Sequence, residues 1–300
     1  MLPRSGPVSM NKLSIANRLI PAFLLIGLAA AAARHPAAAA PPAETVLLTP
    51  HRAVYDLKLS KSRGSRGIQA VRGRILYDFS GNACEGYDLQ FRQVSELDSG
   101  EGKAAVSDLR SSTWEDGAAK KFRFNSENML NDRTTDAVDG HAERDTTTVS
   151  VSLSKPKDKN FTVPVGAVFP TEHMRRIIIG AREDKSILEF PVYDGSETGE
   201  KLYHTLTVIG RPIGPGQKPP NDAGAKIPEL AKLTRWPVTI SFFDQKSEKA
   251  EQTGEQTPVY SISFELYENG VSRALTLDYT DFSISGEMTS LEIKKAKACP

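Results

Sequence analysis

The chain has 300 residues and nearly balanced charge, with 38 basic and 37 acidic side chains and a formal net charge of +1. Such a mixed surface argues against nucleic acid as a partner, because phosphate binding needs a concentrated positive field. The length is sufficient for one large β domain or two smaller domains.

The first 40 residues have the three parts of a secretory signal peptide. Basic residues precede an apolar run of about 15 residues, and an Ala/Pro-rich tract follows it. A membrane-spanning helix needs about 20 residues, so an uncleaved anchor is the weaker alternative. We expect export to the periplasm of a Gram-negative bacterium, with cleavage between Ala33 and Ala43. Residues 41–300 are then expected to form a single β-rich domain, in which no stretch is long and apolar enough to cross a membrane.

From His51 onward, apolar and polar residues alternate with a period of two, which is typical of half-buried antiparallel strands. Asn269-Gly270 lies between two such runs and is a strong hairpin signal. We expect roughly a dozen strands, mainly antiparallel. The clearest runs are residues 51–60, 72–79, 86–94, 145–154, 236–243 and 258–282.

One segment, residues 171–182, has helical periodicity instead. Thr171 follows Pro170 and is the expected N-cap residue. The apolar stripe predicts one amphipathic helix that packs on the sheet. The positions in the stripe are Met174, Ile177, Ile178 and Ala181, and those outside it are His173, Arg175, Arg176 and Arg182.

A segment rich in proline and glycine, residues 212–226, interrupts the strand pattern. Its composition is incompatible with regular structure. Similar strands flank it on both sides, so we favour an exposed insertion in one sheet over a linker between two domains. A weak helical pattern follows at residues 227–233, and the charged stretch 244–256 is expected to be a solvated hairpin tip.

The sequence lacks a compact catalytic or metal-binding motif. No two histidines after the signal-like segment are three to five residues apart, as local zinc ligands usually are. The segment Gly195–Gly199 places its serine second rather than third, unlike a nucleophile elbow. We therefore predict no enzymatic activity, no metal and no cofactor. A hydrolase with a Ser, His and Asp drawn from distant strands is the alternative.

Five side chains are candidates for contacts with a ligand or a partner protein: Trp114, His173, Arg175, Arg176 and Trp236. The tryptophans could line a hydrophobic groove, although core burial explains Trp236 better because it alternates with other apolar residues. The two arginines could bind anionic lipid headgroups, and His173 could act as a base. A solvated helix face is the simpler explanation for all three.

Cysteine is rare, occurring only as Cys84 and Cys299. In an oxidising compartment two cysteines normally pair, and no further metal ligands lie nearby. The absence of a C-x-x-C pair disfavours a redox-active role. We expect a disulfide between them, with a free thiol or an intermolecular bond as the alternative.

The mature part of the chain resembles the EipB family of periplasmic envelope-integrity proteins of alphaproteobacteria. The resemblance rests on the order of several segments: HRAVYDLKLSKS, GRILYDF, CEGYDLQFR, FPTEHM, VYDGSETGEK, RWPVTISFFD, TPVYSISFELYENGV, LDYTDFSISGEM and the final cysteine. It implies a single spiral-like, incompletely closed antiparallel sheet with a helix packed against it. It also implies a Cys84–Cys299 disulfide and a role in envelope stability under stress. The likeness of this architecture to periplasmic lipoprotein carriers suggests a lipid or lipoprotein ligand by analogy of fold.

We therefore expect a non-enzymatic periplasmic protein that supports outer-membrane integrity by binding a lipid, a lipoprotein or an envelope protein. The alternatives are an envelope hydrolase with a dispersed site and a pure protein-interaction scaffold. An open sheet suits the first expectation, because alternate apolar side chains on its concave face can contact an acyl chain or a peptide.

Overall fold

The computed structural model describes residues 46–63, 68–100, 104–218, 220–244, 257–296 and 299. All of them belong to one of the two units into which contacts divide the chain, Ala43–Pro300. The expected signal peptide and most of the expected hairpin tip lie outside the described residues.

One antiparallel sheet of 14 strands makes up most of the described unit. Its first half consists of β1 (His51–Ser62), β2 (Ala70–Asn82), β3 (Gly86–Asp98), β4 (Ala104–Glu115), β5 (Lys121–Leu130), β6 (Arg133–Arg144), β7 (Thr148–Lys155) and β8 (Lys159–Pro164). After a helix, α1 (Pro170–Arg182), the second half consists of β9 (Ile187–Val192), β10 (Tyr203–Ile209), β11 (Arg235–Asp244), β12 (Tyr260–Tyr267), β13 (Ser272–Tyr279) and β14 (Phe282–Ile293). Two short 3-10 helices, η1 (Ala223–Lys226) and η2 (Leu230–Lys232), lie between β10 and β11.

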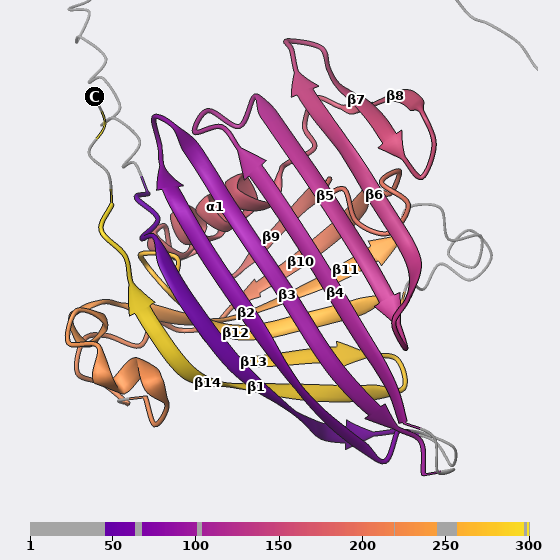
Figure 1. Ribbon diagram of the computed structural model, residues 1–300. Coiled ribbons are helices and arrows are strands. Elements are labelled where there is room, and N and C mark those ends of the chain that lie inside the picture. Colours follow the sequence, from indigo (N-terminus) through magenta and orange to yellow (C-terminus); the bar gives the residue numbers. More distant parts are fainter. Residues whose placement is uncertain are drawn as a thin grey trace, which may run out of the picture. The chain divides into compact units, whose positions relative to one another are not determined.

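The first and last strands, β1 and β14, pair with each other in the interior of the sheet, whereas β8 and β9 are its two edges. From β1 the chain runs outward strand by strand to β8, passes through α1 to β9, and returns inward to β14 (Figure 1). Among the described residues, the segment before α1 meets β9 at one isolated bridge, Val168 to Val192. The sheet is therefore open, and the expected all-β fold with an open antiparallel sheet and one helix is confirmed.

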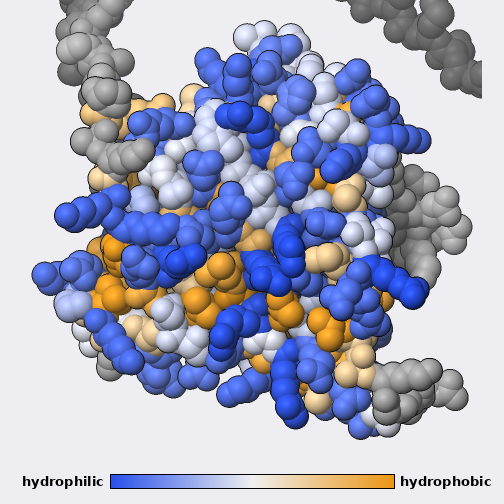
Figure 2. Space-filling model, in the orientation of Figure 1, coloured by the Kyte–Doolittle hydropathy of each residue, from blue (hydrophilic) through white to orange (hydrophobic). Residues whose placement is uncertain are grey.

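The sheet curves around α1, which lies between β1–β3 and the strands of the second half (Figure 1). We call the face toward α1 the inner face and the opposite one the outer face. Because successive side chains of a strand point to opposite faces, every second residue faces α1. On the outer face of the first strands, hydrophilic residues predominate (Figure 2). The buried inward side chains of β1 and β11 include Ala53, Tyr55, Leu57, Trp236, Val238 and Ile240.

Helix α1 begins one residue earlier than its sequence pattern indicates. Pro170 is its first residue and Phe169 is its N-cap, so the prediction of Thr171 as the N-cap residue is wrong. Proline is favoured at the first helical position, since its missing N–H would have no partner in the helix. The predicted stripe does pack inward, with Ile177 and Ile178 fully buried against β10–β12.

The Pro/Gly segment 212–226 joins β10 to β11, which are neighbours in the sheet. Arg273 holds it in place by donating from Nε to Asp222 Oδ2 at 2.7 Å. The helix expected weakly at residues 227–233 is instead the short 3-10 turn η2. Leu230 is buried against Met288 and other residues of β1 and β14.

Candidate functional site

A buried carboxylate attaches the N-terminus of α1 to the sheet. Glu115, at the end of β4, is 2% exposed and accepts hydrogen bonds from the backbone N–H groups of Thr171 (2.7 Å) and Glu172 (2.8 Å). These two groups lack partners within the helix, and a negative charge is favourable at this end of the helix dipole. Burial nevertheless raises the pKa of Glu115 to about 7.

Arg175 and Arg176, two of the candidate contact residues, make hydrogen bonds that hold α1. Arg176 donates to Glu172 at 2.6 Å, and Glu172 also accepts from Arg144 of β6 at 2.9 Å. Arg175 donates to the carbonyl of Gly117 at 2.8 Å. These contacts link the helix to β6 and to the turn after β4, so both arginines are already engaged within the protein.

His173 is buried, although its sequence position lies outside the apolar stripe. It is 5% exposed, and its ring meets Phe190 of β9 edge-on at 5.6 Å. The stripe is wider than the sequence suggests because β9 covers this side of the helix as well. Burial lowers the pKa of His173 to about 4, and its Nε2 has no hydrogen-bond partner among the described residues. The side chain is therefore a neutral part of the core at pH 7.

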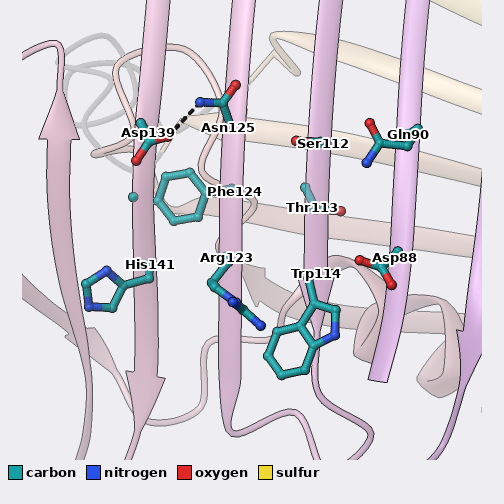
Figure 3. A pocket seen from close by; sticks show the side chains of 11 residues that line it. Asp88, Gln90, Ser112, Thr113, Trp114, Arg123, Phe124, Asn125, Asp139 and His141 are labelled. Atoms are coloured by element: carbon teal, nitrogen blue, oxygen red, sulfur yellow. Dashed lines mark hydrogen bonds between the residues drawn. The ribbon is translucent and has the colours of Figure 1, made fainter. Parts of the chain in front are cut away.

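The two tryptophans lie on opposite faces of the sheet. Trp236 is buried on the inner face with Ile177 and Ile178, as its alternation with apolar residues indicates. Trp114 lies on the outer face, in a shallow depression of about 410 Å³, and the Arg123 guanidinium sits 4.2 Å from the centre of its ring (Figure 3). The depression is lined mainly by polar side chains.

The part of the inner face that α1 does not cover is incompletely packed. Several apolar and aromatic side chains point inward from β2, β3, β12 and β13, yet each is only half-buried. The inward side chains of β4 from residue 107 to residue 113 are polar apart from Leu109. The half-buried apolar set is Tyr77, Leu89, Phe91, Tyr260, Ile262, Leu275 and Tyr279, and the inward polar set is Gln93, Ser107, Ser111, Thr113 and Ser126.

The loop between β9 and β10, residues 193–201, packs against strands of the first half of the sheet. Tyr193 is fully buried and donates from its hydroxyl to the carbonyl of Gly199 at 2.6 Å. Gly195 has φ +68° and lies so close to Phe124 of β5 that a Cβ atom would be 2.4 Å from the ring. The loop therefore covers the inner face of β5–β7 from the opposite edge of the sheet. The sequence alone did not reveal what this loop covers, because the strands it contacts are distant in the chain.

A disulfide joins Cys84 and Cys299, whose Cα atoms are 5.7 Å apart, as expected. Cys84 lies in the turn between β2 and β3, where the Asn82 side chain accepts from the backbone N–H groups of Cys84 and Glu85. Because β1 separates β2 from β14, the bond connects the chain after β14 across β1 to this turn. Lys294 adds an ion pair with Asp78 of β2.

The described residues contain no cluster of three or more His, Cys, Asp or Glu side chains that could hold a metal ion. In the same part of the chain, no helix has the length and hydropathy needed to span a membrane. No described histidine is hydrogen-bonded to a serine or threonine hydroxyl; His51 instead contacts the carbonyl of Thr49 at 2.7 Å.

A family model described as EipB-like matches residues 42–295, which include every strand and α1. The chain belongs to the EipB-like family. It is 37% identical over 257 residues to the cell envelope integrity protein EipB of Brucella abortus (strain 2308), covering 86% of this chain and 88% of that protein. A crystal structure of a beta-barrel-like protein with a domain of unknown function, also from Brucella abortus, matches with a TM-score of 0.75 and 34% identity. That match covers 84% of this chain and all of the other.

Several family segments now have a structural role. HRAVYDLKLSKS is β1, in the interior of the sheet, and FPTEHM opens α1. VYDGSETGEK forms the loop that covers β5–β7.

Proposed function

We propose that this protein acts in the periplasm, after removal of its signal peptide, and supports cell-envelope integrity by binding the acyl chain of a lipid or lipoprotein on its inner face. The relative EipB, named a cell envelope integrity protein, supports the envelope role. The signal-like N-terminal segment supports the location.

The observation that carries the ligand class is the half-buried apolar set on the inner face. Monomeric proteins usually bury side chains that point into the concave side of a sheet, because each one removed from water contributes about 1 kcal/mol or more. Here α1 covers only part of that face, and the neighbouring inward side chains of β4 are polar at Ser107, Ser111 and Thr113. An acyl chain would complete this packing.

The test is identification of bound molecules in protein purified from its own periplasm. Mass spectrometry of organic extracts should find acyl species enriched with the parent protein. They should be depleted in Ile262→Gln, which places an amide in the half-buried set. Val54→Gln, on the outer face of β1, is the matched control and should retain the acyl species.

Crosslinking in the same cells covers the other binding modes. Recovery of an envelope protein without acyl species would replace the lipid with a protein partner. Failure to enrich either class would contradict the proposed function.

A further inference from the structure

The outer face carries a furrow that the proposed function does not use. Its floor is a row of directly paired positions on four neighbouring strands: Gln90, Ser112, Asn125 and Asp139 (Figure 3). Ser112 is small, whereas the rows on either side carry long side chains, and this difference creates the depression.

One wall of the furrow is built around Trp114. The paired positions of this row are Asp88, Trp114, Arg123 and His141. Trp114 is fixed between Arg123 on its ring and the backbone of Gly86, where a Cβ atom would lie 2.8 Å from the indole. Arg123 makes no ion pair or hydrogen bond with other described residues, so its donors are available.

The opposite wall is a fixed cluster of charges. Arg92 binds both carboxylate oxygens of Asp108 (2.9 and 2.8 Å), and Arg110 binds one of them at 2.8 Å. The hydrogen bonds from Arg92 lower the pKa of Asp108 to about 2, so this cluster stays charged. A second depression of about 370 Å³ lies against this wall and shares Gln90, Ser112 and Asn125 with the first.

The dimensions follow from strand geometry. Four strands at their usual spacing give a floor about 14 Å long, and four residues along a strand separate the walls by about 13 Å. The furrow is therefore open at the top, elongated, and wide enough for a chain of linked rings.

The floor offers hydrogen-bonding groups that the protein leaves unused. The side chains of Gln90 and Ser112 make no hydrogen bond to other described residues. Asn125 donates to Asp139 at 2.6 Å and keeps its carbonyl oxygen free, and the hydrogen bond from Asn125 lowers the pKa of Asp139. The free amide of Gln90, hydroxyl of Ser112 and guanidinium donors of Arg123 complement the hydroxyl groups of a sugar chain.

The charges disfavour other ligands. Arg92, Arg110 and Arg123 are outnumbered by the carboxylates of the floor and walls, which are Asp88, Asp108, Glu127 and Asp139. A phosphate-rich ligand needs an excess of positive charge, and an acyl chain needs a mainly apolar lining. At the floor and at the wall around Trp114, the backbone of β3–β6 pairs with strands on both sides, so a peptide cannot add there as a strand.

We infer that the furrow over β3–β6 binds a linear, uncharged oligosaccharide. The two tryptophans supply the assay, because Trp236 is buried in the core and only Trp114 can be reached by a ligand. Tryptophan emission is followed while the purified protein is titrated with linear tetrasaccharides of N-acetylglucosamine, of β-linked glucose or of α-linked glucose. At least one should give a saturable change with a dissociation constant of about 1 mM or tighter.

The variant Gln90→Ala/Asn125→Ala should bind that sugar about tenfold or more weakly, since two hydrogen-bonding side chains are removed from the floor. Arg74→Ala, on the outer face of β2 and outside the furrow, is the matched control and should bind as the parent does. Equal melting temperatures establish that all three proteins are folded. Preference for the N-acetylated chain would indicate an amino-sugar polymer, and equal binding of all three would indicate recognition of hydroxyls alone.

Two results would overturn the inference: no saturable change with any of the three sugars, or unchanged affinity in the double variant. Vesicles of anionic phospholipid should leave the emission of Trp114 unchanged, and a saturable response to them would assign the furrow to lipid. Loss of acyl binding in Ile262→Gln with retained sugar binding would separate the outer furrow from the inner face.

Discussion

Two buried titratable side chains near the N-terminus of α1 both favour the neutral form. That form is protonated in Glu115 and deprotonated in His173. Burial raises the pKa of Glu115 from 4.5 to about 7, so the folded state favours its neutral form. Burial lowers the pKa of His173 from 6.5 to about 4, so the folded state again favours the neutral form. Stability linked to Glu115 falls as pH rises from about 4.5 to 7, whereas stability linked to His173 falls as pH drops from about 6.5 to 4. The two contributions therefore oppose each other in the mildly acidic range.

Replacing His173 with phenylalanine should change the pH dependence of stability in a defined direction. The variant loses the acid-sensitive group and keeps an aromatic ring against Phe190. Its free energy of unfolding, relative to the parent, should therefore rise by about 2–3 kcal/mol between pH 7 and pH 4. Chemical denaturation at several pH values measures this difference.

Glu115→Gln is the control of opposite sign for this experiment. It removes the group that penalises high pH, so its stability relative to the parent should improve as pH rises from about 5 to 7. Weaker capping of α1 should also lower the free energy of unfolding by an amount that is the same at every pH. This loss does not change how the stability difference varies with pH. If the stability difference for His173→Phe were the same at pH 7 and pH 4, the neutral buried histidine would be ruled out.

At the scale of elements, the loop 193–201 supports the open sheet by packing on β5–β7. The close approach at Gly195 makes this contact testable. Gly195→Ala should lower the free energy of unfolding by about 2–4 kcal/mol, because the new Cβ both requires a disfavoured backbone conformation and collides with Phe124. Thermal or chemical denaturation measures the loss.

Gly216→Ala is the matched control for this prediction. Gly216 has φ +72°, similar to Gly195, but its Cβ would meet nothing within 4 Å. It should cost only about 1–2 kcal/mol from backbone strain. Equal losses in the two variants would show that the contact with Phe124 has no energetic importance.

The sequence predicted the elements whose inward positions are apolar, such as β1, β11 and α1. It did not reveal β4 and β5, because their inward positions carry Ser107, Ser111, Thr113 and Ser126, which hide the alternation. The burial of His173 was missed because a strand from the far edge of the sheet covers it. The furrow depends on cross-strand register, and no single segment of the sequence displays it.

At the scale of the whole molecule, the disulfide closes a loop between residues 215 positions apart. Reducing it should destabilise the protein by about 2–5 kcal/mol, since the unfolded chain regains freedom and the segment after β14 loses its attachment. Denaturation with and without reductant should show this loss, and Cys84→Ser/Cys299→Ser should match the reduced parent.

The same double variant should also lower resistance to envelope stress if the proposed function is correct. Each single cysteine variant should be as unstable as the double variant, because either removes the bond. A variant that is as stable and as stress-resistant as the parent would contradict a stabilising role for the disulfide.

The pairing of β1 with β14 has a consequence for how the protein comes into being. Ribosomes make a chain from its N-terminus, so β1 has only one neighbour, β2, until nearly the whole polypeptide exists. The strands β1–β8 can assemble early as a meander of local pairings, but no strand of the second half pairs with one of them until β14 has been made. A chain interrupted a mere twenty residues short would lack β14 and divide its sheet in two. A chain without β14 therefore leaves β1 and β13 with unpaired edges in the middle of the sheet.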